Sequence, residues 1–186
     1  STHSSPNLSH GLNAIHIDAM NAQLVIEENI FYRVPTGISS TFPGNHLNNN
    51  VFIDSESRAI GQSDRSNIFC KNADIDAGPN LRIMSRMSTQ LTGMRYKQPP
   101  WSYRYPPLVN MLEIEPAKWG KIRGSIIERN INTGGSFVSF SRGQQEMTLF
   151  RNNFDGEDPI FFDRDKMDFR IRPGSPAYGL TGAYPV

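Results

Sequence analysis

The sequence predicts an all-β solenoid, in which short parallel strands wind into stacked coils of about 22 residues. Three observations predict it. A short word built on asparagine recurs at a nearly constant interval, a second set of strand-like segments keeps that interval, and many of the 15 Gly and 13 Pro residues lie near segment ends. A chain of 186 residues is long enough for one such domain, so we expect residues 1–186 to form a single domain.

The recurring word places an asparagine after an apolar residue and two further residues. Its asparagines are Asn29, Asn50, Asn130 and Asn152, with a degenerate copy at Asn72, so the successive steps are 21, 22, 58 and 22. The copies alternate apolar positions and are rich in Ile, Val and Phe, which indicates strands rather than helices. We expect the asparagines to form a ladder, in which each side-chain amide bonds its neighbours in the adjacent coils.

A second set of strands precedes the asparagine words. Ile17, Ile38 and Ile60 repeat the steps of 21 and 22 that separate the first asparagines. Two strand sets with one period are best explained as successive faces of one coil, with equivalent residues stacked about 4.8 Å apart. We expect two inner rows, one of Ile17, Ile38, Ile60 and Phe140, and one of Phe31, Phe52 and Phe154.

The long step from Asn72 to Asn130 predicts an excursion from one coil, over residues 77–120, made of a loop and a short helix. Residues 166–186 hold a strand and a Pro-Gly turn, which suits a C-terminal closing segment. Residues 1–10 are polar and contain no capping pattern. We therefore expect either further N-terminal coils or another chain over the first coil, because an uncapped solenoid end exposes its core and its strand edges.

The composition argues against several classes of function. The formal net charge is +1 and no apolar run approaches the roughly 20 residues of a membrane span, so we expect no nucleic-acid and no membrane partner. The single cysteine, Cys70, permits no intramolecular disulfide and gives no sign of zinc. The tight acidic groups at 74–76 and 155–158 fit ordinary turns, so we expect no metal and no cofactor. The sequon Asn7-Leu8-Ser9 supports an extracellular origin, and we expect an extracellular or periplasmic location.

Several segments resemble a known family. The asparagine words, then Trp101-Ser-Tyr-Arg-Tyr-Pro-Pro-Leu108, then Gly124-Ser-Ile-Ile-Glu-Arg-Asn-Ile131, then Phe169-Arg-Ile-Arg-Pro-Gly-Ser-Pro-Ala177 follow one another as in large carbohydrate-active β-helix proteins. The resemblance covers about Gly11 to the C-terminus. It implies a right-handed parallel β-helix, similar to the C-terminal part of glycoside hydrolase-like or polysaccharide lyase-like proteins.

Asp18 is the catalytic candidate that the resemblance implies. In such relatives the strand matching residues 15–18 often carries two adjacent acids, whereas here Asp18 is followed by Ala19. Hydrolysis of glycosides generally needs two carboxyl groups. His16 faces the same side of the strand and is a candidate general base or sugar contact, although both residues also fit an exposed strand end. We expect the row of His16 to contain Gly37, Ala59 and Ser139.

The aromatic and basic part of the excursion is the candidate sugar-binding site. Sugar rings stack on Trp and Tyr, and Arg holds hydroxyl or carboxylate groups. The alternative is a loop whose aromatic side chains hold the excursion against the solenoid. The candidate substrate-binding residues are Trp101, Tyr103, Tyr105, Arg104 and Arg95.

The expected function is carbohydrate-directed: a β-helix that binds a polysaccharide or oligosaccharide along one sheet face. Whether it also cleaves the ligand stays open, and glycoside hydrolysis is favoured over a lyase reaction, which needs a cation or Arg beside the uronate. The alternative is a non-catalytic structural or interaction protein whose open first coil docks onto another chain. An enzyme should show a close pair of carboxylates beside the excursion, and an interaction protein should not.

Overall fold

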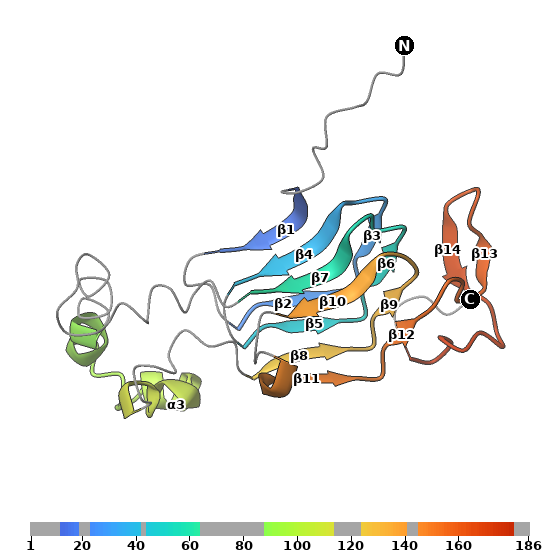
Figure 1. Ribbon diagram of the computed structural model, residues 1–186. Helices are drawn as coiled ribbons and strands as arrows, with labels where there is room; N and C mark the ends of the chain where they lie inside the picture. Colours follow the sequence, from blue (N-terminus) through green and yellow to red (C-terminus); the bar gives the residue numbers. More distant parts are fainter. Residues whose placement is uncertain are drawn as a thin grey trace, which may run out of the picture. The chain divides into compact units, whose positions relative to one another are not determined.

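The computed structural model describes residues 12–18, 23–41, 44–63, 88–113, 124–140 and 145–180 (Figure 1). The chain divides into two compact units. The first unit joins Ser1–Ser63 to Ile122–Val186, and the second unit is Asp64–Lys121. The described strands all belong to the first unit.

Three parallel sheets of four strands build the first unit, and each coil of the chain adds one strand to each sheet. Sheet A contains β1 (Asn13–Ile17), β4 (Thr36–Ser40), β7 (Arg58–Gln62) and β10 (Ser136–Phe140). Sheet B contains β2 (Val25–Glu27), β5 (His46–Asn48), β8 (Ser125–Glu128) and β11 (Thr148–Arg151). Sheet C contains β3 (Ile30–Tyr32), β6 (Val51–Ile53), β9 (Ile131–Asn132) and β12 (Phe154–Asp155). The predicted all-β fold of stacked parallel strands is confirmed, and it is compatible with a β-helix-like solenoid.

A left-handed residue ends each strand of sheet B. A positive φ turns the chain sharply, which ends the strand and directs the chain into sheet C. The next residue along the chain is in each case an asparagine, so turn and asparagine recur together. The four left-handed residues are Glu28 (φ 60°), Asn49 (φ 55°), Arg129 (φ 57°) and Asn152 (φ 53°).

The asparagines that follow these turns form a ladder. The Oδ1 of Asn50 accepts hydrogen bonds from the backbone N and the Nδ2 of Asn29, at 3.2 and 3.0 Å. Asn130 accepts from Asn50 in the same way, at 3.0 and 3.1 Å. Asn153 accepts from Asn130 at 2.9 and 3.1 Å. The buried amides are therefore satisfied by their neighbours in the stack, as burial of polar groups requires.

Two details of the predicted repeat are wrong. The last member of the ladder is Asn153, because Asn152 occupies the left-handed turn position. Asn130 bonds directly to Asn50, although the two are far apart in the chain, so no coil lies between them. The degenerate copy at Asn72 lies outside the described residues.

The predicted inner rows are correct in part. The rings of Phe31 and Phe52 stack with centroids 4.8 Å apart and planes 7° apart, as expected. The partner of Phe52 in β9 is Asn132, however, and Phe154 pairs with Ile131 in the neighbouring row. In sheet A, Ile15 rather than Ile17 pairs with Ile38, and Val138 rather than Phe140 pairs with Ile60.

The shifted rows follow from connections of unequal length. Asn13 in β1 pairs with Thr36 in β4, whereas Val25 in β2 pairs with His46 in β5. The chain therefore advances two positions further between the first two strands of sheet A than between the first two strands of sheet B. A single interval applied to both sheets puts the wrong residue of β1 opposite Ile38.

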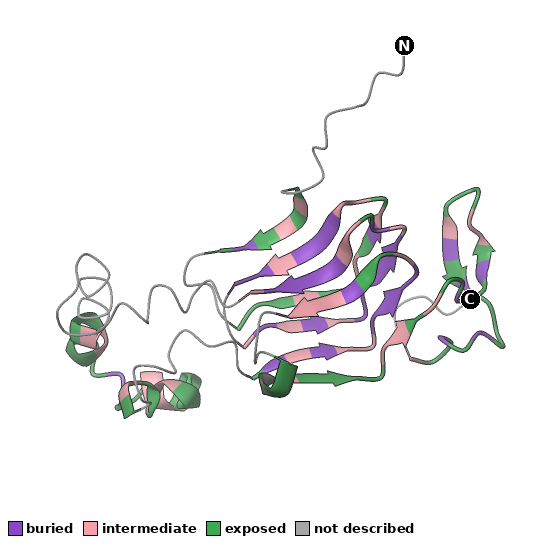
Figure 2. Cartoon of the chain, viewed as in Figure 1, coloured by how far each residue is buried: buried purple, intermediate pink, exposed green. Residues whose placement is uncertain are grey.

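Two hydrophobic clusters cover opposite faces of sheet C. The inner cluster fills the space between the sheets and includes Phe31, Leu47, Phe52 and Ile127. Buried residues are concentrated in strands such as β4 and β7 (Figure 2). The outer cluster packs an antiparallel hairpin, β13 (Phe161–Asp163) and β14 (Asp168–Ile171), onto sheet C. The C-terminal segment therefore covers a side of the coils.

The second unit contains short helices. Residues 88–93 are helical, followed by α3 (Trp101–Arg104) and the 3₁₀ turns η2 (Pro106–Leu108) and η3 (Met111–Glu113). The Nζ of Lys97, in the turn before α3, lies 2.7 Å from the Oε1 of Glu113 in η3. A further 3₁₀ turn, η5 (Gln145–Met147), belongs to the first unit.

Candidate functional site

Four polar residues form a row across the outer face of sheet B. In β2, β5 and β8, the residue just before the polar one packs in or against the inner cluster; these residues are Ile26, Leu47 and Ile127. Side chains alternate between the two faces of a strand, so the polar row points outward. In strand order the row consists of Glu27, Asn48, Glu128 and Arg151.

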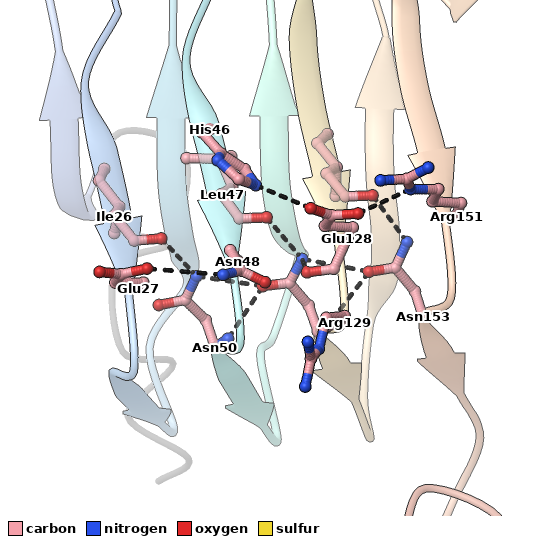
Figure 3. A network of polar contacts seen from close by, with 12 residues as sticks. Ile26, Glu27, His46, Leu47, Asn48, Asn50, Glu128, Arg129, Arg151 and Asn153 are labelled. Carbon is pink, nitrogen blue, oxygen red and sulfur yellow. Dashed lines mark hydrogen bonds and ion pairs between the residues drawn. The ribbon is translucent and has the colours of Figure 1, made fainter. Parts of the chain in front are cut away.

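His46 joins this row through Glu128. The Nε2 of His46 lies 3.1 Å from Oε1 of Glu128, and the Nε of Arg151 donates to Oε2 of the same carboxylate at 2.7 Å (Figure 3). The Nδ2 of Asn48 donates to Oε2 of Glu27 at 3.5 Å. We refer to Glu27, His46, Asn48, Glu128 and Arg151 as the sheet B cluster.

Glu128 is the central charge of the sheet B cluster. Its side chain is 14 % exposed, against 33 % for His46 and 54 % for Arg151. The hydrogen bond from Arg151 holds the pKa of Glu128 below its ordinary value of 4.5; burial acts in the opposite direction, and the bond with His46 lowers the pKa further. Glu128 is therefore a fixed, ionised acceptor at neutral pH, which suits it to charge-assisted hydrogen bonds.

Asn48 leaves one acceptor of the cluster unused. Its Oδ1 is buried and receives no hydrogen bond from the described residues. Leaving a buried acceptor without a donor costs about 1–3 kcal/mol.

An apolar row runs beside the polar row on the same face. Val25 is 59 % exposed and Leu149 is 46 % exposed, with Ile126 half-buried between them and His46 as the polar member. The outer face of sheet B thus offers hydrogen-bonding groups along one line and aliphatic carbon along the next. A ligand with polar edges and apolar faces matches this pattern.

The structure places His16 and Asp18 on sheet A rather than beside the sheet B cluster. The Nε2 of His16 lies 3.9 Å from Oδ2 of Asp18, and the two side chains are 40 % and 63 % exposed. Two of the three predicted members of this row, Gly37 and Ala59, are wrong and Ser139 is correct, because both β1 and β10 are shifted by two residues from the predicted register. The row of His16 contains Ser39, Gly61 and Ser139, and no acid.

The aromatic candidates of the second unit are only partly brought together. The rings of Trp101 and Tyr105 stack with centroids 6.2 Å apart, and the Arg104 guanidinium lies 6.0 Å from the centroid of Tyr105. Tyr103 is 88 % exposed, and Arg95 is exposed as well. Three of the five candidates therefore form one aromatic and basic patch, and no contact joins the other two to it among the described residues.

Other acids of the first unit are used in ion pairs. Asp54, in a turn after β6, pairs with Arg164 and lies 3.7 Å from the Nε of Arg33. Asp163 pairs with Lys166 at 2.7 Å. Within the described residues, no group of three or more His, Cys, Asp or Glu side chains could hold a metal ion. The same part of the chain contains no helix with the length and apolarity that a membrane crossing requires.

Comparisons with protein-family models, with curated proteins and with solved structures found no match for this chain. The resemblance to carbohydrate-active β-helix proteins therefore stays an expectation from sequence.

The sheet B cluster was not predicted from the sequence, although a signal for it exists. Each residue of the polar row lies two positions before a ladder asparagine. An alignment of the repeats on the ladder would have put the row in one column. Choosing Asn152 as the last repeat hid the pattern, because it puts Phe150 where Arg151 belongs.

Proposed function

We propose that this protein binds a polysaccharide along the outer face of sheet B. The observation that carries the proposal is the polar row with the ionised, immobilised Glu128 at its centre and an exposed apolar row beside it. Sugars offer hydroxyl donors at their edges and C–H groups on their ring faces, so they can use both rows at once.

The spacing of the rows favours a polymer over a single sugar. Neighbouring strands of a sheet lie about 4.8 Å apart, so the row presents one polar side chain per coil at that interval. A chain of sugar units laid across the strands meets a new donor or acceptor at every coil.

The proposal includes a right-handed coil, since parallel crossovers are right-handed in about 98 % of cases. Such a ligand also favours an extracellular or periplasmic protein, which detection in secreted or periplasmic fractions of the native source would test.

Binding is tested by retention on immobilised glycans. We expect wild type to be retained on at least one polysaccharide, and Glu128→Gln to weaken retention about tenfold, because the fixed charge is lost while the shape stays. Arg151→Gln serves as a second variant at a more exposed position. The matched control is Asp163→Asn, which removes a carboxylate charge from β13. Retention of neither wild type nor variants, or equal retention of Glu128→Gln, Arg151→Gln and wild type, contradicts the proposal.

Hydrolysis is a second activity that one feature of this site favours. Glu27 and Glu128 point to the same face with one strand between them, which puts their α-carbons about 10 Å apart. Carboxyl groups about 6.5–9.5 Å apart are typical of inverting glycosidases. Because its pKa is lowered, Glu128 is ionised at neutral pH, as the carboxylate that accepts a proton from water must be. Glu27 would then be the acid that protonates the leaving oxygen.

The test of hydrolysis is the release of reducing ends from the retained polysaccharide. We expect Glu27→Gln and Glu128→Gln each to lower release at least a hundredfold, and NMR of the first product to show an inverted anomer. Asp18→Asn is the control, since Asp18 lies on another sheet. Loss of activity in Asp18→Asn alone would move the catalytic site back to sheet A. If a polysaccharide is retained but not cleaved, the binding proposal stands and the hydrolytic one fails.

A further inference from the structure

The asparagine ladder has a direction, and this gives its two ends different chemistry. Each Oδ1 accepts from the asparagine of the preceding coil. Within the described residues, the Oδ1 of Asn29 therefore receives no hydrogen bond, and the backbone N–H of Asn153 gives none. The first coil therefore presents an unused hydrogen-bond acceptor, and the last coil presents an unused hydrogen-bond donor.

The side-chain rows of sheet B also end in complementary residues. The polar row begins with Glu27 and ends with Arg151, so an acid stands at one end and a base at the other. The apolar row begins with Val25, 59 % exposed, and ends with Leu149, 46 % exposed. If a first coil followed a last coil in the same register, opposite charges and apolar side chains would become direct neighbours, which stabilises parallel pairing.

An open hollow lies on the last coil, and such a coil could fill it. The hollow has a volume of about 430 Å³ and is lined by residues that include Val138, Phe140 and Phe150. These three continue inward rows of sheets A and B whose first members are, respectively, Ile15, Ile17 and Ile26. An inner side chain of a solenoid is covered by the next coil. The hollow is therefore shaped by residues that match the inner side chains of the first coil.

We propose that copies of this chain associate head to tail, with the first coil of one copy stacked on the last coil of the next. Asn153 of one copy then donates to Asn29 of the other, and Arg151 lies beside Glu27. Because the two surfaces differ, the contact is heterologous and builds open chains rather than closed dimers. Asp155 falls opposite Phe31 in this register, which limits the strength of the contact. The inference does not depend on carbohydrate binding.

Sedimentation velocity over a hundredfold range of protein concentration tests this inference. Wild type should grow from monomers to short chains as concentration rises. Ile30→Asp puts a charge on the first coil, at a position 43 % exposed, and Phe150→Asp puts one in the hollow of the last coil. Each variant alone should associate at least tenfold more weakly than wild type. An equimolar mixture should form a 1:1 dimer, because each variant keeps the end that the other has lost.

A control variant carries the same charge at a site away from both ends of the coils. Met167→Asp places the same charge in the β13–β14 turn, at a position 63 % exposed, and should associate like wild type. Circular dichroism melting checks that each variant is folded, and Leu149→Lys replaces Phe150→Asp if that variant unfolds. The inference is overturned if the wild type stays monomeric. It is also overturned if Ile30→Asp alone forms dimers, because these would show contact between two last coils. Glycan retention is measured separately, so the failure of either proposal is recognised without the other.

Discussion

Gly37 is a residue at which the packing between coils allows no side chain. A Cβ added there would lie 2.5 Å from Cε1 of Phe52 and 2.6 Å from the carbonyl oxygen of Ala59. Gly37→Ala therefore forces the buried ring or the backbone to move, and we expect the free energy of unfolding to fall by about 1–3 kcal/mol in urea denaturation. The control is Gly61→Ala on the next coil, where the nearest atom, 3.3 Å away, belongs to the flexible side chain of Arg58. Equal stability of the two variants would contradict this account.

Glu128 makes a pH-dependent contribution to stability. Its pKa is lower in the folded protein than its ordinary value of 4.5, chiefly through the hydrogen bond from Arg151, so folding favours the ionised form. The contribution is fully present above about pH 4.5 and is lost as pH falls through the depressed value. We expect the stability difference between wild type and Glu128→Gln to be largest near neutral pH and to shrink below about pH 4.5, in urea denaturation at several pH values. A difference that grew on acidification would contradict the pairing.

Two residues, Asp18 and Glu128, show what the sequence could and could not predict about the site. Asp18 was singled out by resemblance; it directly follows β1 of sheet A, and the row of His16 in that sheet contains no second acid. Glu128 lay inside a repeat word and its own neighbours in sequence gave no sign of its partners. His46 and Arg151 reach it from two other strands, both distant in the chain. Contacts of that kind depend on the register, which spacing alone does not fix.

At the scale of strands and turns, the sequence predicted the repeat but not its phase. Alternating apolar residues and the interval in the low twenties were enough to predict strands, stacking and the asparagine ladder. The connection from sheet A of the first coil to sheet A of the second is two residues longer than the corresponding step in sheet B, and this displaced the predicted row of Ile17. Of the hairpin β13–β14, the sequence predicted only the strand β14, as part of a closing segment, and missed β13. The position of the hairpin on the outer face of sheet C follows from long-range packing of Phe161 and Phe169.

The last turn of sheet B provides a direct test of the ladder. The structure assigns the hydrogen-bonding position to Asn153 and the left-handed turn position to Asn152. Asn153→Ala removes two accepted hydrogen bonds from Asn130, and we expect a loss of about 1–3 kcal/mol in the free energy of unfolding. Asn152→Gly keeps the positive φ and should change stability by less than about 1 kcal/mol. If thermal or urea unfolding showed a larger loss of stability for Asn152→Gly than for Asn153→Ala, the result would favour Asn152 as the ladder residue, as the sequence spacing predicted.

At the scale of the whole molecule, the first unit is continuous across the excursion. Before the excursion, the backbone N–H of Ser63 donates to the carbonyl oxygen of Ser40; after it, Gly44 donates to the Oγ of Ser125 and Asn50 bonds Asn130. The second and third coils therefore meet on both sides of the point where the chain leaves. Gly44 and Gly124 are both left-handed, with φ of 78° and 65°, which indicates that the third coil resumes at the equivalent turn position. These contacts belong to the first unit alone.

The second unit should therefore be removable. In the preceding coil the dipeptide Phe42-Pro43 joins Thr41 to Gly44, so the same dipeptide in place of residues 64–123 would restore the equivalent connection between Ser63 and Gly124. We expect the shortened chain to keep a β-type circular dichroism spectrum and to unfold cooperatively, because no hydrogen bond of the ladder crosses into the second unit. A control in which a Gly-Ser linker of the original length replaces the excursion separates the effect of loop closure from the loss of the second unit. If the control folds and the shortened chain does not, the two glycine turns are not equivalent. If neither folds, the coils need the second unit, and the continuity seen at Asn50 and Asn130 is not sufficient for stability.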